Sequence, residues 1–283
     1  MSVHAKLPAK PVFCVESRLR PVLKWAGGKA SLLPQLVPLF PRAFERYVEP
    51  FVGAGAVFLA VDPGVPALLA DANAELVNLY SVIRAHPLAL MDALDALAEH
   101  YSEAHYYSVR AVCPALPVAC AARTIYLNKT GFNGLYRQNR SGAFNVPFGK
   151  RVRCPALYDR ANLLALSARL ANATLLHRDF EEVMEGAGAG DFVYCDPPYE
   201  PLNPTSSFNA YKAGGFSRAD QTRLREACVR AVGRGAAVAV SNSSAPFIVD
   251  LYAGDDLHRV KARRAINSKA TARGVIDEVL VRF

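Results

Sequence analysis

The chain has 283 residues, of which 52% are hydrophobic and 20% are charged. This composition provides a sizeable core and excludes global disorder and a small disulfide-stapled scaffold. At roughly 150 residues per domain, the length predicts about two domains or one large domain with an insertion. A net charge of +8 suits a polyanionic partner but also ordinary solubility.

The cysteines and the N-terminus give no sign of export. The six cysteines form no CxxC pair, which is typical of reduced thiols in a chain of this size. Residues 1–20 are interpreted as a flexible leader without the apolar run of a signal peptide. No stretch approaches the roughly 18 apolar residues of a membrane span. We therefore expect a cytoplasmic protein that does not contact a membrane.

The expected elements begin with a βαβ unit. From Arg46 the run YVEPFVGAGAVFLAV predicts a buried strand, a glycine turn and the first turns of a helix, and PALLADANAEL repeats strand, acidic residue and helix start. Between about His86 and Leu157 the pattern changes to the helical stretches LALMDALDALAEHY and PVACAARTIYLNK. A Gly-, Asn- and Arg-rich segment follows them.

Strands resume after this segment. They are expected at residues 173–177, 191–195 and 236–242, with a helix at about 218–233, a short helix after residue 242, and closing strands near 257–262 and 276–282. This alternation predicts an α/β fold with a mostly parallel sheet and helices on both faces. The middle segment is interpreted as a separate, mainly helical domain inserted into that fold.

Positive charge is concentrated in two segments. From Arg123 to Arg153 and from His258 to Arg273 the chain has Lys and Arg but no Asp or Glu. Aromatic rings and amides, which stack on bases and hydrogen-bond to their edges, are interleaved with the first segment. They are Phe132, Tyr136, Phe144, Phe148, Asn133, Asn139 and Asn145. The pattern favours a nucleic-acid-binding surface, with a solvated surface loop as the alternative.

Gly53 and Gly55 in FVGAG indicate a ligand site. They follow a strand and are expected to precede a helix whose N-terminus faces the ligand. Phe58 replaces the third glycine of a dinucleotide fingerprint, so a ligand with one nucleoside and a charged amino-acid tail fits better. Asp71 ends the next strand, where its carboxylate can accept two ribose hydroxyls. A purely structural strand–turn–helix is the alternative.

The segment KWAGGK at residues 24–29 ends in GGK but lacks the other residues of a phosphate-binding loop. Trp25 and Lys29 at this glycine turn can instead hold an aromatic ligand face and a carboxylate. A lone tryptophan packed on the core is the alternative.

The most informative residues are Asp196-Pro197-Pro198-Tyr199, directly after the expected strand DFVYC. The prolines remove N–H donors and fix the chain, so the Asp196 carboxylate and the Pro197 carbonyl form a rigid acceptor pair for an exocyclic amine. Accepting both protons directs the nitrogen lone pair toward an electrophile, while Tyr199 offers a stacking face for the base. A proline turn that merely ends a strand is the alternative, which the neighbouring motifs disfavour.

Together, KWAGGK, YVEPFVGAGAVF, LADANAEL, HRDF, YCDPPY and NGLYRQNRSGAFNVPFGK resemble the motifs of Dam-type DNA adenine-N6 methyltransferases of the alpha arrangement. The resemblance runs from about Pro21 to Phe283. DPPY is shared with RNA and other amino-methyltransferases, whereas YRQNRSGAFNVPFG points to the Dam branch. The resemblance implies a Rossmann-like S-adenosylmethionine-dependent methyltransferase domain in residues 21–85 and 158–283. It also implies a mainly helical target-recognition domain in residues 86–157.

The resemblance also suggests site residues. The catalytic motif is Asp196, Pro197, Pro198 and Tyr199. Candidate contacts to S-adenosylmethionine are Trp25, Lys29, Phe51, Gly53, Gly55, Asp71, Asp179, Phe180 and Asp196. Among these, Asp179 and Phe180 correspond to positions beside the cofactor adenine.

DNA contacts are expected mainly in the inserted segment. The candidates are Lys24, Phe132, Asn133, Leu135, Arg137, Asn139, Pro147, Lys150 and Arg151. By resemblance, Leu135, Arg137 and Pro147 read a base pair of GATC, Asn133 lies near the flipped adenine, and Lys24 contacts the outer guanine. Phe132 and Arg151 depart from the family pattern. Phe132 replaces a tyrosine and should still stack between bases, whereas Arg151 stands where relatives often have another aromatic residue and affects flanking preference.

The resulting hypothesis is adenine-N6 methylation in double-stranded DNA, in GATC, by a monomer that flips the target base. Stacking on Tyr199, at roughly 1–3 kcal/mol, helps to recover a flipping cost of a few kcal/mol. No metal is expected, because transfer from a sulfonium dissipates charge and no histidine pair has ligand spacing. Residues 201–216 are expected to form a lid over DNA or a plain loop.

Two other classes of function are weighed against this hypothesis. An RNA or ribosomal RNA amino-methyltransferase shares FVGAG and DPPY but does not require the Arg-rich insertion. A DNA-binding regulator without catalysis is disfavoured because DPPY is intact. Family members of this kind also occur in restriction–modification pairs.

Overall fold

The computed structural model describes residues 13, 19–25, 27–62, 64–139, 142–201, 215–263 and 275–283. Most of the expected leader, nearly all of the expected lid at 201–216, Arg140 and much of the second basic segment lie outside the described residues.

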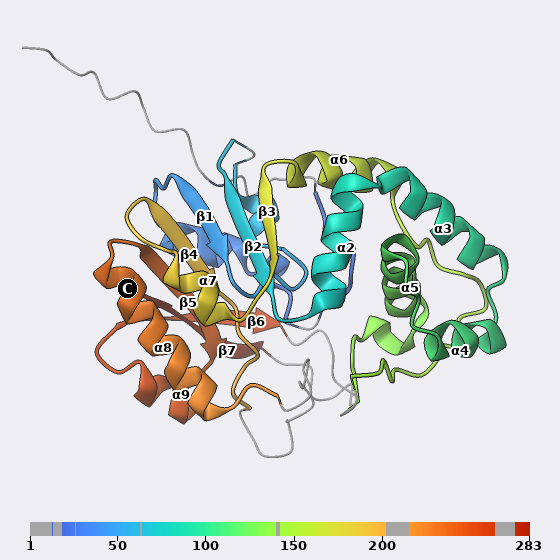
Figure 1. Cartoon of the computed structure of the whole chain (residues 1–283). Coiled ribbons are helices and arrows are strands. Elements are labelled where there is room, and N and C mark those ends of the chain that lie inside the picture. Colours follow the sequence, from blue (N-terminus) through green and yellow to red (C-terminus); the bar gives the residue numbers. More distant parts are fainter. Residues whose placement is uncertain are drawn as a thin grey trace, which may run out of the picture.

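The described part of the chain contains a seven-stranded sheet in the order β3-β2-β1-β4-β5-β7-β6 (Figure 1). β1 to β5 run parallel, β7 is antiparallel to β5, and β6 is antiparallel to β7. The mixed, mostly parallel α/β sheet expected from the sequence is therefore confirmed. The strands are β1 Arg46–Glu49, β2 Ala67–Asp71, β3 Ala173–His177, β4 Asp191–Cys195, β5 Ala237–Ser243, β6 Asp256–Arg263 and β7 Val275–Arg282.

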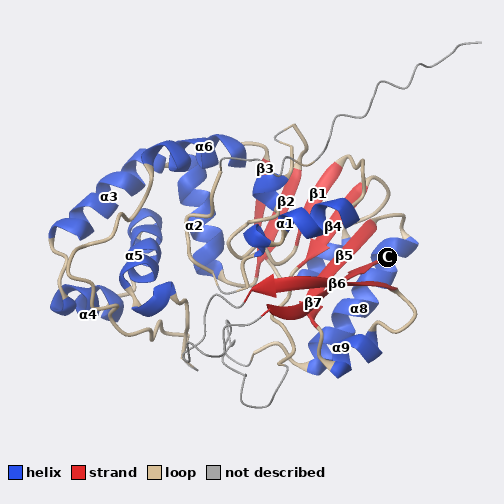
Figure 2. Cartoon of the chain, turned by 180° about the vertical axis from the view of Figure 1, so that it is seen from behind, coloured by secondary structure: helices blue, strands red, loops and turns tan. Residues whose placement is uncertain are grey.

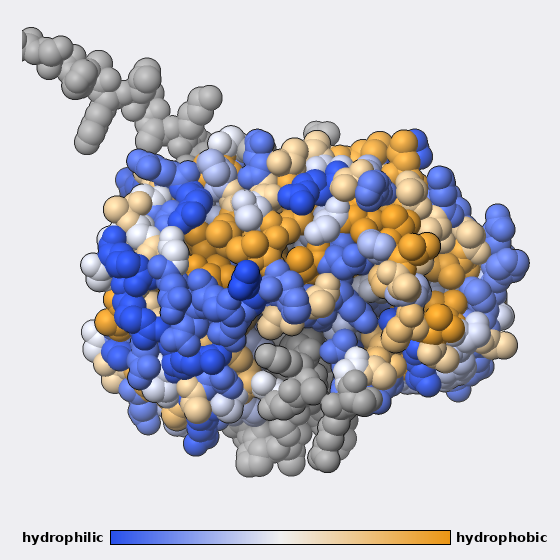
Figure 3. All heavy atoms as spheres, viewed as in Figure 1, coloured by the Kyte–Doolittle hydropathy of each residue, from blue (hydrophilic) through white to orange (hydrophobic). Residues whose placement is uncertain are grey.

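Helices cover both faces of this sheet. α7, α8 and α9 lie on the face turned toward the viewer in Figure 1, and Figure 2 shows α1 on the opposite face. Hydrophilic residues dominate the outer surface of the α7–α8 layer (Figure 3). The α-helices are α1 Leu33–Leu36, α2 Ala74–Ala85, α3 Pro87–Glu99, α4 Glu103–Ala111, α5 Pro117–Thr130, α6 Arg160–Leu170, α7 Phe180–Glu185, α8 Arg218–Gly233 and α9 Pro246–Leu251. Short 3-10 helices are η1 Lys29–Ser31, η2 Val37–Leu39, η3 Phe58–Ala60 and η4 Phe132–Gly134.

Alternate residues of the central strands enter opposite layers of the core. Tyr47 of β1 and Phe192 of β4 belong to the cluster that includes α1 and α2, whereas Val48 and Val193 belong to the cluster that includes α7, α8 and α9. Side chains alternate in this way because a strand repeats every two residues. Because both faces of the sheet are covered, apolar residues follow one another within the central strands, as in Tyr47-Val48 and Phe192-Val193.

The middle of the chain folds as helices beside the sheet (Figure 1). α5 contacts α2, α3 and α4, while α6 packs against α2 and α3. α5 is buried over most of its length, including Ile125, Tyr126 and Leu127. The helical stretches expected between His86 and Leu157 are therefore present, and α2 connects them to the sheet.

The prediction of a helix directly after FVGAG is wrong. Turns follow Gly55, only Phe58–Ala60 form a 3-10 helix, and Val61 is already extended. Arg169 of α6 explains part of this, because its guanidinium lies 4.1 Å from the Phe58 ring centroid and donates to the Phe58 and Val61 carbonyls. A side chain thus satisfies carbonyls that helix continuation would otherwise pair. The ligand-facing helix N-terminus inferred for this turn does not exist.

Among the described residues, no helix is long and apolar enough to cross a membrane.

Candidate active site

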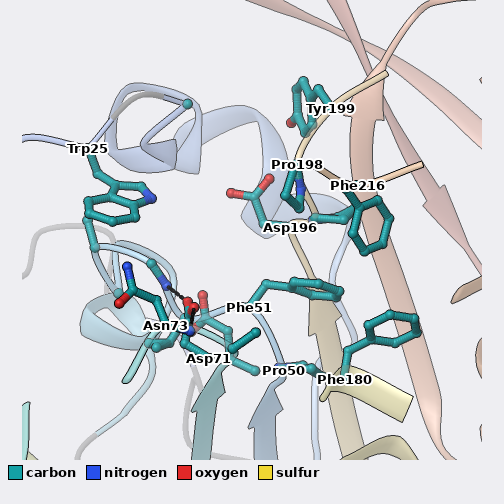
Figure 4. Close-up of a pocket in the computed structure, with 18 of the residues that line it drawn as sticks. Trp25, Pro50, Phe51, Asp71, Asn73, Phe180, Asp196, Pro198, Tyr199 and Phe216 are labelled. Atoms are coloured by element: carbon teal, nitrogen blue, oxygen red, sulfur yellow. Dashed lines mark hydrogen bonds between the residues drawn. The ribbon is translucent and has the colours of Figure 1, made fainter. Parts of the chain in front are cut away.

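A cavity of about 580 Å³ lies at the carboxyl ends of β1, β2 and β4. The strand order reverses between β1 and β4, and open α/β sheets bind ligands at such a switch point. The volume lies within the usual range for small-molecule sites. Figure 4 shows Phe51, Phe180 and Phe216 on one side of it, Trp25 on the other, and Asp71 and Asp196 between them.

Asp71 joins the FVGAG turn to the end of β2. Its Oδ2 accepts a hydrogen bond from Gly53 N at 3.0 Å and its Oδ1 accepts one from Asn73 N at 2.9 Å. Burial raises the pKa of Asp71 to about 6, although both hydrogen bonds oppose that shift. Each carboxylate oxygen has a further lone pair, so Asp71 can still accept hydrogen bonds from a ligand in the cavity.

Gly53 is required by both conformation and space. Its φ is +47°, and a Cβ on Gly53 would stand 3.1 Å from Nε1 of Trp25. The Tyr80 hydroxyl donates to the Gly53 carbonyl at 2.8 Å, which fixes the turn from the α2 side. The close approach expected at this glycine is therefore occupied by Trp25, which lines the cavity.

An aromatic cage with a charged edge forms the opposite wall. The rings of Phe51 and Phe180 stack with centroids 5.2 Å apart, and Phe216 lies 5.8 Å and 5.7 Å from them. Arg223 of α8 lies 4.5 Å from the Phe180 centroid and donates to Asp179 Oδ2 at 3.0 Å. Flat apolar faces beside a carboxylate suit a heterocyclic base with an exocyclic amine.

The catalytic carboxylate expected at Asp196 has a buried counter-charge. Lys29 Nζ lies 2.9 Å from Asp196 Oδ1, and the Lys29 side chain is 3% exposed. Burial raises the pKa of Asp196, while Lys29 opposes that shift. Lys29 Nζ also donates to the Gly27 carbonyl and lies 4.7 Å from the centroid of the Tyr199 ring. The structure thus brings together the KWAGGK and DPPY motifs.

The backbone after Asp196 is fixed by polar side chains. Gln221 donates to the Pro198 carbonyl at 3.0 Å, and Ser243 Oγ donates to the Glu200 carbonyl at 2.7 Å. Within the described ranges, no residue donates to the Pro197 carbonyl. Pro197 therefore keeps a free acceptor beside the Asp196 carboxylate, in a loop where the Pro198 and Glu200 carbonyls are already bonded.

Two buried glutamates of the site were missed in the sequence. Glu49 ends β1 and lines the cavity, where the Tyr47 hydroxyl donates to its Oε2 at 2.9 Å. Burial raises the pKa of Glu49 well above its usual range. Glu278 of β7 accepts from the Tyr199 hydroxyl at 2.8 Å. In the sequence, Glu49 ends a short strand and Glu278 follows another acidic residue, Asp277, so neither stands out, and no local pattern gives their partners.

The segment from 131 to 149 folds back on itself through two short bridges, Gly131 to Phe148 and Gln138 to Phe144. Its exposed positions include Phe132, with 50% of its surface accessible. The next residue, Asn133, is also exposed and has φ of 55°. An accessible ring before a left-handed residue suits a side chain that enters a base stack.

The other aromatic residues of this segment have a different role from the one inferred. Tyr136, Phe144 and Phe148 are buried in the core. Tyr136 lies 4.9 Å from Trp25 by ring centroids, and its hydroxyl donates to Glu75 Oε2 at 2.9 Å. The aromatic spacing thus reflects packing at these three positions and anchors the segment to the cavity wall.

Arg137 is held by a neighbouring asparagine. Its Nε donates to Asn145 Oδ1 at 2.7 Å and its Nη2 donates to the Asn145 carbonyl at 3.3 Å. The side-chain oxygen and the carbonyl of Asn145 thus position this guanidinium. Arg123 was also expected to be a charge on the surface, but it is 5% exposed and its side chain donates to the Val109 and Arg110 carbonyls.

The remaining candidate DNA contacts occupy varied environments. Lys24, Asn139, Pro147, Lys150 and Arg151 are exposed, and Leu135 is partly buried against the core. The Lys24 stem packs against Gly134, where a Cβ would meet Lys24 Cδ at 2.4 Å. No group of His, Cys, Asp or Glu side chains in the described part of the chain could hold a metal ion.

Comparisons with known proteins assign the family. The family model for D12 class N6 adenine-specific DNA methyltransferases matches residues 25–266. A type II methyltransferase of Lactococcus lactis subsp. cremoris, M1.LlaDCHI, is 38% identical over 271 residues, which cover 93% of this chain and 95% of that protein. The DNA adenine methylase of Escherichia coli K12 is 37% identical over 268 residues, covering 93% and 95%.

A third relative comes from an archaeon. The type II methyltransferase M.MjaIII of Methanocaldococcus jannaschii is 36% identical over 288 residues, with 94% of this chain and 99% of that protein covered. A solved precorrin-8W decarboxylase from Methanobacterium thermoautotrophicum has a TM-score of 0.38 and 11% identity, over 93% of this chain and 94% of that one, and is too distant to carry an argument.

The chain therefore belongs to the D12 class of N6 adenine-specific DNA methyltransferases. It is an adenine-specific DNA methyltransferase, and its substrate is DNA.

Proposed function

We propose that this enzyme transfers a methyl group from S-adenosylmethionine to adenine N6 within GATC in duplex DNA, after the adenine has flipped out of the helix. The acceptor pair at Asp196 and Pro197 is the observation that carries the proposal. A carboxylate and a free carbonyl on a proline-fixed loop match the two protons of an exocyclic amine.

The residues around the cavity fit the proposed cofactor. Asp71 presents carboxylate lone pairs for the ribose hydroxyls, and the cage of Phe51 and Phe180 offers flat faces for the cofactor adenine. Trp25 lies at the opposite wall (Figure 4) and Lys29 also lines the cavity, and we assign both to the amino-acid end of the cofactor. When bound, S-adenosylmethionine supplies an electrophilic methyl group on a sulfonium.

The catalytic roles divide among neighbouring groups of the DPPY loop. Lys29 engages Asp196 Oδ1, and we assign Oδ2 to accept a hydrogen bond from the target amine. The Pro197 carbonyl accepts a hydrogen bond from the second N–H, so the nitrogen lone pair is directed away from both acceptors and toward the methyl group. Tyr199 provides a face for the flipped base, for which stacking contributes roughly 1–3 kcal/mol.

The target-recognition role is proposed for residues 86–157. Relatives named DNA adenine methylase, including the Escherichia coli protein, support GATC as the sequence. Within this segment we assign base reading to Leu135, Arg137 and Pro147, and insertion into the stack to Phe132. The contact between Tyr136 and Trp25 supports close placement of this segment beside the methyl-transfer site.

Methyl incorporation into defined substrates tests the proposal. The substrates are a GATC duplex, duplexes with each single-base change, and ribosomal RNA, and the product nucleosides are identified after digestion. We expect N6-methyladenine in GATC, with each wrong base costing about 1–3 kcal/mol of discrimination. Equal labelling of all duplexes would reject GATC reading, and preferential labelling of ribosomal RNA would replace the proposal with an RNA amino-methyltransferase.

A further inference from the structure

The inverted strand β7 delivers a carboxylate to the catalytic loop. β7 pairs antiparallel with β5, and Glu278 lies opposite Ser243 near the end of β5. The first half of an antiparallel strand reaches the edge where the parallel strands end. Glu278 is 9% exposed, and its Oε2 accepts a hydrogen bond from the Tyr199 hydroxyl at 2.8 Å.

Tyr199 is therefore held at its far end as well as at its backbone. The two prolines before it fix the chain, and the bond to Glu278 fixes the direction of the ring. Lys29 Nζ stands 4.7 Å from the ring centroid and 2.9 Å from Asp196 Oδ1. A swing of the side chain about χ1 would carry the hydroxyl away from Glu278 and change the surroundings of the ammonium that pairs with Asp196.

A carboxylate is a costly hydrogen-bond acceptor at this buried position, because its charge loses hydration. Glu278 is buried near Asp196, which raises the pKa of Glu278, while Lys29 and the Tyr199 hydroxyl lower it. Burying a second carboxylate beside the first costs free energy that a neutral acceptor would avoid. In return, a hydrogen bond to a charged acceptor is about twice as strong as one between neutral groups, which gives a more rigid ring.

We propose that Glu278 is a positioning residue that acts through the Tyr199 hydroxyl and sets the position of the ring on which the target adenine stacks. The inference rests on the proposed roles of Asp196 to Tyr199. Glu278 does not touch the base in this account. Its effect is on the geometry of the stacked base relative to the acceptors, and a displacement of about 1 Å can slow a reaction about 100-fold.

Four variants test this role by single-turnover methyl transfer to a GATC duplex. Glu278→Leu removes the acceptor, Tyr199→Phe removes the donor, the double variant removes both, and Glu278→Gln keeps an acceptor oxygen. We expect Glu278→Leu and Tyr199→Phe each to lower kcat by about 10- to 100-fold, with unchanged cofactor affinity. The double variant should be no slower than the worse single one, and Glu278→Gln should recover most of the rate.

Tyr194→Phe is the matched control, because it removes a buried tyrosine hydroxyl on β4 that pairs with Ser241 Oγ at 2.7 Å. It should retain the wild-type kcat. A wild-type rate in Tyr199→Phe, multiplied losses in the double variant, or an equal loss in Tyr194→Phe would each overturn the positioning role. Failure of the proposed function has a separate signature, which is a wild-type enzyme that does not methylate adenine or an Asp196→Ala variant with an unchanged rate.

Discussion

The ammonium of Lys29 lies 2.9 Å from Oδ1 of Asp196, and the lysine side chain is almost completely buried. The two residues come from KWAGGK and DPPY, which are far apart in the sequence. A buried lysine is costly unless it is paired, so each residue accounts for the other's presence. The ammonium favours the ionised form of the carboxylate and contacts one of its oxygens, and we propose that the other oxygen accepts a hydrogen bond from the amine.

Replacing Lys29 by Met should move the acid limb of the pH–rate profile upward. Burial raises the pKa of Asp196 and Lys29 opposes that rise, so loss of the ammonium lets the pKa rise further. Since the ionised carboxylate is the form that accepts a hydrogen bond from the amine in the proposed mechanism, activity should disappear at a pH about 1 to 3 units higher than in the wild type, the usual effect of an opposite charge.

The profile of kcat/KM against pH measures this shift. Lys261→Met is the control, because Lys261 pairs with Asp277 at 2.8 Å on the surface and should leave the profile unchanged. An acid limb at the wild-type position in Lys29→Met would contradict a role of Lys29 in keeping Asp196 charged.

Cofactor binding should depend on pH through Asp71. The pKa of Asp71 is raised to about 6, so the carboxylate becomes protonated as the pH falls through this value and loses acceptor strength. If only the ionised form binds tightly, affinity should fall up to about tenfold per pH unit below about pH 6 and remain constant above it.

Calorimetry with S-adenosylmethionine at pH 5, 6, 7 and 8 measures the effect. Asp71→Ala should weaken binding at pH 7, because each charge-assisted hydrogen bond contributes roughly 1.5–3 kcal/mol. Asp71→Asn should bind weakly with little dependence on pH. Unchanged affinity in Asp71→Ala would reject this carboxylate as a cofactor contact.

The sheet could be predicted closely because its strands are short apolar runs bounded by turn and polar residues. All five residues of β4 are buried, and β3 and β4 have the boundaries expected from ATLLH and DFVYC. Helices with weaker apolar patterns were missed. In α4, only Tyr106 is buried, so the apolar pattern of this helix is weak. The N-cap Ser102, whose side chain accepts a hydrogen bond from His105 N, is a clearer sign of the helix than its apolar pattern.

The candidate site could be predicted only where its residues form local motifs. Asp71, Asp196 and Trp25 line one cavity as the motifs suggested. The partners Lys29 and Glu278 depend on strand order, including the inversion of β7, which no local pattern encodes. The prediction of a helix after FVGAG was wrong for a similar reason. The guanidinium of Arg169, from the distant helix α6, donates to the Phe58 and Val61 carbonyls, and no local pattern indicates this contact.

Arg137 should read one base pair, with Asn145 holding it in place. If the guanidinium is bidentate to a guanine, Arg137→Ala should cost about 1–3 kcal/mol on GATC and relax discrimination at one position. Asn145→Ala should relax the same position more weakly, because Nε and Nη2 of Arg137 lose their partner. Methylation rates on GATC and each single-base variant measure both effects. A uniform loss on every duplex would show that Arg137 supplies only positive charge.

Lys150 should behave differently from Arg137. It is exposed, and we expect it to contact a phosphate. Lys150→Ala should weaken binding to all duplexes about equally and reduce the slope of log K against log salt by about one. Binding titrations at several salt concentrations check this. A change in base discrimination without a change in slope would contradict a phosphate contact.

The most direct test of the account is single-turnover methyl transfer to adenine N6 in a GATC duplex by Asp196→Asn. This variant keeps the shape of the side chain but loses its charge, so the rate should fall by about 10² to 10⁴, the effect of one positioned transition-state group. DNA affinity, measured in parallel, should change much less. A rate within a few-fold of the wild type would contradict the assignment of Asp196 as the acceptor that activates the amine.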